Sequence, residues 1–392
     1  MAQRRRGSIR AARGQAVTFV ELFFDLVFVF AVTQLTALTA HNLTPDGILR
    51  SILLGWLIWW AWTQFTWTLN PADTTHPTVR IVTLAATGVA LVMAASVPRA
   101  FAEDALWFAI PYVLVRVLGL ALQLYVDLER TEGGHAGVAT WAGFSSIGLA
   151  LVLIGAVVDP GLRPWVWLLA IVGDLVAAAM AGRGAVWDLN PGHLSERHGL
   201  FVIIAIGESL IVAGTAVAND QRSVALGLAA LAAILVASLL WWTYFGWLKD
   251  ALEHRYAAAP PERMGPLARD AFSLAHFPLI GGIVGFAVAI EEIGAHPAEP
   301  APPVVLASLG IGVALFVASS ALSLRLCGGA VLVPRLAILG LMLAALVVSA
   351  PMQPVWPLMV VALALLAVVV IEGGGVDVVH EPEPGPSYST PP

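Results

Sequence analysis

Val20–Leu35, with the sequence VELFFDLVFVFAVTQL, decides the fold class of this chain. The stretch is apolar and long enough to enter a bilayer, yet Glu21 and Asp25 lie one helical turn apart on one side of it, and Thr36 follows on the same side. A carboxylate at the depth of the hydrocarbon costs about 3 kcal/mol even on a lenient insertion scale, so another group must compensate it. The stretch therefore predicts a membrane helix that carries a functional site.

The composition of the whole chain is that of a membrane protein. Of its 392 residues, 59% are hydrophobic and 12% are charged, and the mean hydropathy is +0.84. A soluble domain of this length needs more charge to cover its surface, and the apolar runs lack the period-two alternation of a membrane β-barrel. We therefore predict an all-α, polytopic protein of the cell membrane, surrounded by the lipid bilayer and without a nucleic-acid partner. The single cysteine, Cys327, excludes an internal disulfide and a multi-cysteine metal site.

Twelve apolar runs have the length of a membrane span. The basic segment 1–17 precedes the first of them. We interpret that run as an uncleaved helix, because it is too long for a signal peptide and contains two acids. The predicted spans are 18–40, 48–68, 78–97, 104–127, 138–158, 163–181, 196–218, 223–247, 268–290, 303–323, 333–349 and 354–371.

The basic residues set the predicted orientation. With the N-terminus inside, most of the 20 Lys and Arg residues fall on the cytoplasmic side, Arg197 among them, and Arg116 falls within the membrane. Both termini are therefore predicted to be cytoplasmic. The predicted regions are a basic tail (1–17), a first six-helix half (18–181), a second six-helix half (182–371) and an acidic, Pro-rich tail (372–392) that we expect to be disordered.

Two short patterns recur about half a chain apart. The segment 62–67 (WTQFTW) returns as 242–247 (WTYFGW), and the A-x-x-Q of 31–34 can be laid on the A-x-x-E of 205–208. An even number of spans separates the members of each pair, so both halves have the same orientation. The sequence thus predicts two parallel repeats, related by an axis normal to the membrane.

Six ionisable side chains are candidates for an ion pathway or for coupling. By the sequence, four acids lie deep in the membrane against one Arg and one His, so the acids in excess must be protonated, hydrated or bound to a cation. Such an excess is what a proton or cation pathway requires. The candidates are Asp25, Glu208, Glu21, Arg116, Asp174 and His276.

Among these candidates we expect Asp25 and Glu208 to be the central ionisable sites, with Arg116 as their charge partner and His276 as a relay. A structural role stays open for each. Glu21 lies near the start of its helix, where an acid interacts favourably with the helix dipole. Glu208 could form a buried pair with Arg116 that only fixes helix packing, and His276 could be a hydrogen-bonded interior histidine.

Known enzyme and cofactor motifs do not occur in the sequence. The segment 193–198 (HLSERH) gathers two histidines and an acid, but its spacing matches neither H-E-x-x-H nor H-x-x-E-H, and Arg197 intervenes. We interpret it as the start of a helix with Ser195 as N-cap. No nucleotide loop, nucleophile elbow or flavin fingerprint is present, so we predict no cofactor, no metal site and no enzymatic activity. An intramembrane enzyme stays a third alternative.

Two stretches resemble the bacterial low-temperature-requirement protein A family. They are 21–31 (ELFFDLVFVFA) and 193–210 (HLSERHGLFVIIAIGESL). The resemblance covers nearly the whole membrane region. It implies a multi-pass cell-membrane protein, in a family whose name records a cold-growth phenotype rather than an activity.

The segment 23–33 (FFDLVFVFAVT) is also similar to the F-S-D-x-V-F-A-I-A-I-T first helix of the lysosomal potassium-channel family and its bacterial relatives. Eukaryotic members of that family have two six-helix halves, with helices 1 and 7 lining the pore. Here Phe24 replaces the Ser, Phe19 stands where the family has Arg, and the second half lacks the motif around 197–199. Potassium conduction is therefore not carried over.

The sequence thus predicts a transporter or channel for a small cation, linked to proton movement, with H⁺ or a monovalent cation as the transported species. The alternative is a non-transporting membrane sensor or assembly factor needed for cold adaptation, in which the polar residues fix the register of the helices. A homo-oligomer is compatible with either function.

Overall fold

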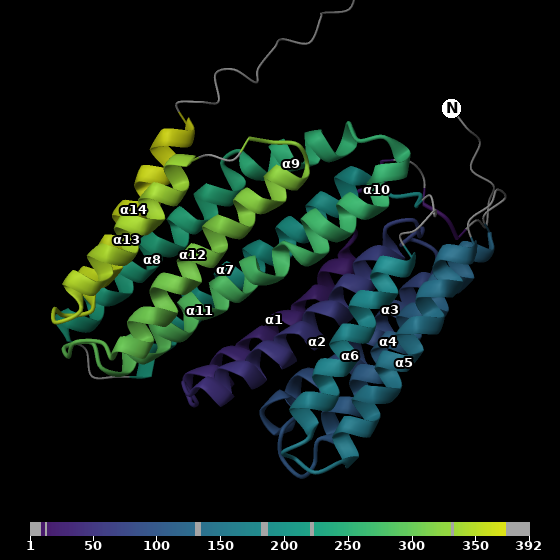
Figure 1. The fold of residues 1–392 in the computed structure, drawn as a ribbon, viewed down its shortest axis with the longest axis horizontal. Helices are drawn as coiled ribbons and strands as arrows, with labels where there is room; N and C mark the ends of the chain where they lie inside the picture. The colour runs from purple at the N-terminus through teal and green to yellow at the C-terminus, as the bar shows by residue number, and fades with distance from the viewer. Residues whose placement is uncertain are drawn as a thin grey trace, which may run out of the picture.

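The computed structural model describes residues 9–11, 14–129, 135–181, 187–219, 223–330 and 333–373. The described part is a bundle of helices without a β-strand (Figure 1), in which Arg10 and Ala72 form one isolated backbone bridge. Within it, ten helices are long and apolar enough to cross a membrane. The prediction of an all-α, polytopic membrane protein is confirmed.

The first half contains six long helices and one short 3₁₀ turn. Side chains define several of their starts: Thr18 and Glu21 form a capping box at the first helix, and the Thr44 hydroxyl accepts a hydrogen bond from Gly47 N at the second. The elements are α1 (Phe19–Ala40), α2 (Pro45–Leu69), α3 (Pro77–Ala95), η1 (Val97–Arg99), α4 (Leu106–Leu128), α5 (His135–Val157) and α6 (Arg163–Ala181).

The second half has the expected long helices and two short ones that the sequence did not predict, α9 and α10. A π-helical segment, η2, connects α10 to α11, so these three elements follow each other almost without a break. The elements are α7 (Pro191–Asn219), α8 (Val224–Phe245), α9 (Leu248–Ala257), α10 (Pro261–Leu267), η2 (Ala268–Leu274), α11 (His276–Ala295), α12 (Pro303–Leu326), α13 (Val333–Ser349) and α14 (Val355–Gly373).

Each predicted span corresponds to one helix of the described part; the bounds agree for 163–181 and 333–349, and the other spans have shifted ends. The largest consequence concerns α7, which begins at Pro191 and not at the predicted N-cap Ser195. Ser195 is therefore inside the helix and 1% exposed. Proline is favoured in the first turn of a helix because its missing N–H has no intrahelical partner there.

Helix α2 is enclosed by neighbours from both halves. It packs against α1, α4 and α6 on one side and against α7 and α11 on the other. Most of its residues are buried, including Thr63 and Gln64. The part of α2 from Leu53 on is surrounded by protein and needs no lipid-facing apolar surface, which explains how it can carry polar residues in the middle of the bundle.

The pattern of neighbouring helices in the first half recurs in the second. Helix α1 packs against α2 and α3, as α7 packs against α8 and α11; α3 packs on α4 and α5 on α6, as α11 packs on α12 and α13 on α14. Figure 1 shows the halves as two groups of helices, with α1 and α2 beside α7 and α11. The two parallel repeats stay a prediction, with which these contacts are compatible.

Helix α14 ends at the same end of the bundle at which α1 begins (Figure 1); we call this the terminal end and the opposite one the far end. Ile9 is 1% exposed and Arg10 forms an ion pair with Asp188, so these residues of the predicted tail 1–17 pack on the bundle. Glu372 belongs to α14, whereas residues 374–392 of the predicted acidic tail lie outside the described residues.

Candidate functional site

Polar side chains of α1, α2 and α7 meet inside the bundle. Arg197 donates from Nη2 to Asp25 Oδ1 at 2.8 Å, and the indole N–H of Trp62 donates to the same oxygen at 2.7 Å. The guanidinium of Arg197 also lies over the Trp62 ring, 5.6 Å from its centroid. All three side chains are fully buried. The charge of Asp25 is therefore compensated by a cation of the other half.

Glu21 caps the start of α1 and reaches α7 at the same time. Its Oε1 accepts hydrogen bonds from the backbone N–H and the hydroxyl of Thr18, at 2.9 and 3.0 Å. Its Oε2 lies 2.9 Å from Nε2 of His193 and 3.7 Å from Nη1 of Arg197. Glu21 is thus placed for both the helix-end role and the inter-helix role that the sequence leaves open.

The position of Arg197 corrects the charge count made from the sequence. That count puts Arg197 on the cytoplasmic side, but its side chain is fully buried. The physical reason is the early start of α7 at Pro191, which places Arg197 about two turns inside the helix. Two arginines, Arg116 and Arg197, and not one, are therefore buried in the same bundle as the four candidate acids.

A second buried ion pair lies within the first half. Arg116 of α4 binds both carboxylate oxygens of Asp174 of α6, with Nη2–Oδ1 at 2.9 Å and Nη1–Oδ2 at 3.2 Å. Nη1 also donates to the Tyr112 hydroxyl at 2.7 Å, and Nε donates to Gln64 Oε1 of α2. This two-pronged geometry is the strong form of the Arg–carboxylate contact. Arg116 is therefore the partner of Asp174 and does not pair with the two acids considered from the sequence.

Glu208 differs from the other three acids, because no basic side chain of the described residues pairs with it. It is 1% exposed, and its Oε1 has no hydrogen-bond partner. Thr33 of α1 is near enough to interact with it across the helix interface, and the Thr33 hydroxyl donates to the Val29 carbonyl oxygen at 3.2 Å. Glu291 of α11 is near enough to interact with it electrostatically, which adds a like charge and no compensation.

His276 lies directly after the π-helical segment. Its Nδ1 is 2.9 Å from the Ala271 carbonyl oxygen and its Nε2 is 2.8 Å from the Tyr244 hydroxyl, so both ring nitrogens have partners. The ring centroid is 5.2 Å from that of His198, a fully buried residue of α7 that the sequence did not single out as a candidate. Single π turns inside helices are frequent at functional sites.

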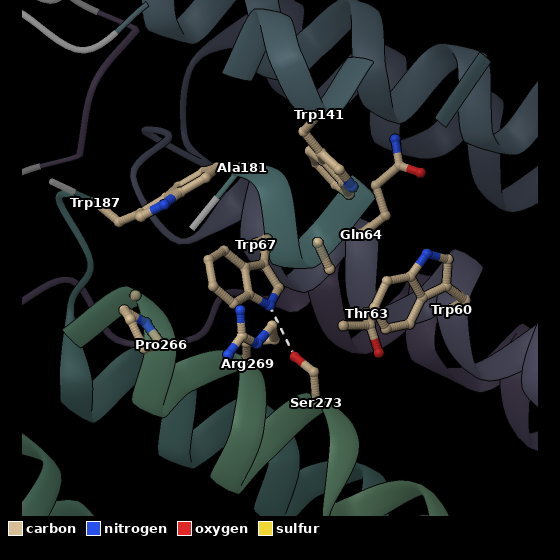
Figure 2. Close-up of a pocket in the computed structure, with 12 residues that line it drawn as sticks. Trp60, Thr63, Gln64, Trp67, Trp141, Ala181, Trp187, Pro266, Arg269 and Ser273 are labelled. Carbon is tan, nitrogen blue, oxygen red and sulfur yellow. Dashed lines mark hydrogen bonds between the residues drawn. The ribbon is translucent and has the colours of Figure 1, made fainter. Parts of the chain in front are cut away.

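The π segment is also attached to α2 by two tryptophans. Trp59 donates from its indole nitrogen to the Ser273 carbonyl oxygen at 2.7 Å, and Trp67 donates to the Ser273 hydroxyl at 2.9 Å. Figure 2 shows Trp67 and Ser273 at a pocket between α2 and the second half, with Arg269 beside them. Its volume of about 40 Å³ leaves room for a few water molecules but not for an organic cofactor.

Metal ligation has no support in the described ranges. There, no group of three or more His, Cys, Asp or Glu side chains is arranged to hold a metal ion. The two histidines of 193–198 point to different neighbours: His193 to Glu21, and His198, through Nδ1, to the Leu194 carbonyl oxygen at 2.9 Å. The segment is therefore a helical surface that supplies partners to α1.

Replacing Trp62 by Phe is expected to lower the free energy of unfolding by about 1.5–3 kcal/mol through the lost donor to a charged carboxylate. The smaller phenyl ring leaves part of the buried space empty and adds to this loss. Thermal unfolding in detergent measures the change. Trp242→Phe is the matched control, since Trp242 is 58% exposed on α8. Equal stability of the two variants would contradict the assigned role of the Trp62 indole.

Comparisons with known proteins agree with this architecture. Residues 16–370 match the family described as bacterial low temperature requirement A protein (LtrA). An uncharacterized protein of Rhizobium meliloti (strain 1021) is 28% identical over 290 residues, which cover 71% of this chain and 70% of that protein. No solved structure matches the chain. With its apolar helices, this integral, multi-pass membrane protein belongs to the bacterial low temperature requirement A family.

Proposed function

We propose that the protein transports a small cation across the membrane, linked to the movement of protons, and that Glu208 is the acid that binds the moving ion. One observation supports this above all: Glu208 is buried in a membrane helix without a basic partner among the described residues. A carboxylate in such a place has to bind a proton or a cation, or be reached by water. Reversible binding of an ion is the chemistry that this position offers.

Asp25 has a different part in the proposal. Because Arg197 already compensates its charge, Asp25 is a link between α1 and α7 and not a free ion site. Helices α1 and α7 hold equivalent places in the two proposed repeats, and in repeat-built transporters one bundle moves against the other. The Asp25–Arg197 pair is the contact that such a movement would break and remake.

The proposed orientation places the terminal end in the cytoplasm. It rests on the excess of Lys and Arg that the sequence predicts for that side. Several of these residues are in elements near the terminal end, among them Arg10, Arg80, Lys249 and Arg255. The proposed transported species is H⁺ or a monovalent cation.

Flux measured in proteoliposomes tests the proposal. Purified protein is reconstituted with a pH-sensitive dye inside, and a gradient of K⁺ or Na⁺ is imposed. Wild-type vesicles should show a cation-dependent pH change, and Glu208→Gln should slow it about tenfold or more, as about 1.4 kcal/mol in the barrier would.

Glu299→Gln is the matched control for that experiment. It removes the same charge from an exposed position after α11 and should leave the flux unchanged. Wild-type flux in Glu208→Gln would refute the role of Glu208. A pH change in wild-type vesicles that is no faster than in protein-free vesicles would refute transport altogether.

A second candidate function is a membrane sensor or assembly factor that transports nothing. The closed pairs favour it, because Asp25–Arg197, Glu21–His193 and the pair in the first half could serve only to fix the helices. It predicts no flux above that of empty vesicles. It also predicts that neutral variants of the paired acids act on stability alone.

A further inference from the structure

A cavity of about 400 Å³ lies between the two halves, toward the far end. Its walls come from α1 and α2 on one side and from α11 and α12 on the other, and Phe201 of α7 forms part of its inner wall. Neither Asp25 nor Glu208 is among the residues that line it. The cavity is therefore separate from Glu208, the proposed ion-binding acid, and from the Asp25–Arg197 pair.

The wall of this cavity offers no free polar side chain. Three hydroxyl groups line it, and each donates to a backbone carbonyl oxygen, so none has a free hydrogen to donate to a ligand. The fourth polar group, the indole N–H of Trp59, is occupied by the π segment. An apolar cavity whose polar groups are satisfied stays dry and takes apolar ligands. The three hydroxyl bonds are Thr39 to Leu35 (2.7 Å), Ser51 to Gly47 (2.9 Å) and Ser308 to Gly285 (2.9 Å).

The rim of the cavity is continuous with the lipid-facing surface of the bundle. Ile52 of α2 and Ile311 of α12 line the cavity, and they are also 52% and 56% exposed. In helices that span a membrane, exposed apolar side chains face the hydrocarbon. Exposed apolar side chains of α2 and α12 thus form the rim of the cavity, on the side where we expect the hydrocarbon of the bilayer.

We propose that this cavity binds the acyl chain of a bilayer lipid, which enters between α2 and α12 and lies between the two halves. A volume of about 400 Å³ is within the range of small-molecule pockets, about 300–1,000 Å³. A bilayer lipid is the occupant that fits a rim of exposed apolar side chains. A charged or polar solute would lose its hydration without gaining a partner.

Glycines of α11 and α12 distinguish the contact between these two helices from the open space of the cavity. A Cβ at Gly285 would lie 3.2 Å from the Ser308 carbonyl oxygen, and one at Gly312 would lie 2.7 Å from the Gly282 carbonyl oxygen, so both allow α11 and α12 to approach closely. A Cβ at Gly281 would meet nothing within 4 Å. Gly281 therefore borders open space, and a larger side chain there fills the cavity without displacing backbone.

Photocrosslinking in vesicles tests the proposal. The probe is a phosphatidylcholine with a diazirine on one acyl chain, and labelled peptides are mapped by mass spectrometry. In the wild type, label is expected on the cavity-facing stretch 280–288 of α11 as well as on lipid-facing α13. Gly281→Phe should lose the α11 label and keep the α13 label.

Gly340→Phe is the matched control, because a Cβ there also meets nothing within 4 Å and the residue is exposed on α13. It should retain the α11 label, and Gly281→Leu, a milder change, should reduce it. An unlabelled α11 stretch in the wild type, or equal α11 labelling in Gly281→Phe, would overturn the proposal. Labelling by a single-chain detergent probe but not by the phospholipid would overturn it as well. The readout is independent of ion flux, so it stands apart from the proposed function.

Discussion

Asp25→Asn is expected to lower the free energy of unfolding by about 3–5 kcal/mol, because it leaves the Arg197 guanidinium buried without its closest counter-charge. The carboxylate accepts from Arg197 at 2.8 Å and from Trp62 at 2.7 Å, and the remaining acid, Glu21, is 3.7 Å from the guanidinium. Equilibrium unfolding in mixed micelles, or the midpoint of thermal unfolding in detergent, measures the loss.

A double variant separates the pair from the packing around it. Asp25→Asn combined with Arg197→Gln removes both charges and should regain much of the stability lost by the single change, which gives a coupling free energy by the double-mutant cycle. Asp46→Asn is the control: Asp46 is 61% exposed and pairs with Arg50 on the surface of α2, so its loss should cost about 1 kcal/mol or less. A single variant as stable as the wild type would show that the pair does not join the halves.

Asp174→Asn is expected to cost a similar amount, about 3–5 kcal/mol, because Arg116 would then lie fully buried without a counter-ion. The Tyr112 and Gln64 oxygens would still accept its hydrogen bonds but could not compensate its charge. Thermal unfolding of the two Asp→Asn variants compares the pairs directly.

Arg116→Lys tests the geometry of this pair. The lysine keeps the charge but lacks the planar fork that binds both oxygens of Asp174. Arg116→Lys should therefore be less stable than the wild type and more stable than Asp174→Asn. Wild-type stability in Asp174→Asn would contradict the assignment. Wild-type stability in Arg116→Lys would show that the charge of Arg116, and not its two-pronged geometry, stabilises the pair.

The helices themselves could be predicted from the sequence, since spans of about twenty apolar residues have few other solutions in a bilayer. The errors have local causes. Helices α9 and α10 were missed because residues 248–267 are polar and each helix is short. The start of α7 was misplaced because Ser195 and Glu196 look like an N-cap and a first-turn acid, while Pro191 is the residue that begins the helix.

Part of the polar network was also within reach of the sequence. Glu21 and Asp25 are four residues apart on α1, and His193 and Arg197 are four residues apart on α7. Residues at this spacing share a helix face, so two acids on one helix could have been matched with two bases on another. The misplaced start of α7 concealed the match, because it put His193 before the predicted span and Arg197 at the cytoplasmic edge of it.

Other features depend on how the helices pack and had no signal in the sequence. The residues around Arg116 do not indicate which acid is its neighbour. The structure shows that it is Asp174, and not Asp25 or Glu208. The π segment before His276 and the cavity beside Gly281 arise where α11 approaches α12 and α2. These features follow from distances between helices, which a single sequence does not contain.

The buried ion pairs reduce the excess of buried acids from which the sequence predicts transport. The sequence suggests an excess of several buried acids, but Arg197, His193 and Arg116 provide basic partners for three of the four. The excess that stays is Glu208, and the proposed ion binding rests on that residue.

Ion-driven current through a membrane that contains the reconstituted protein tests this claim most directly. Wild type and Glu299→Gln should give equal currents under the same proton and cation gradients, and the current of Glu208→Gln should be at least about tenfold smaller. A current of wild-type size in Glu208→Gln would contradict the account, because the ion would then move without the unpaired acid.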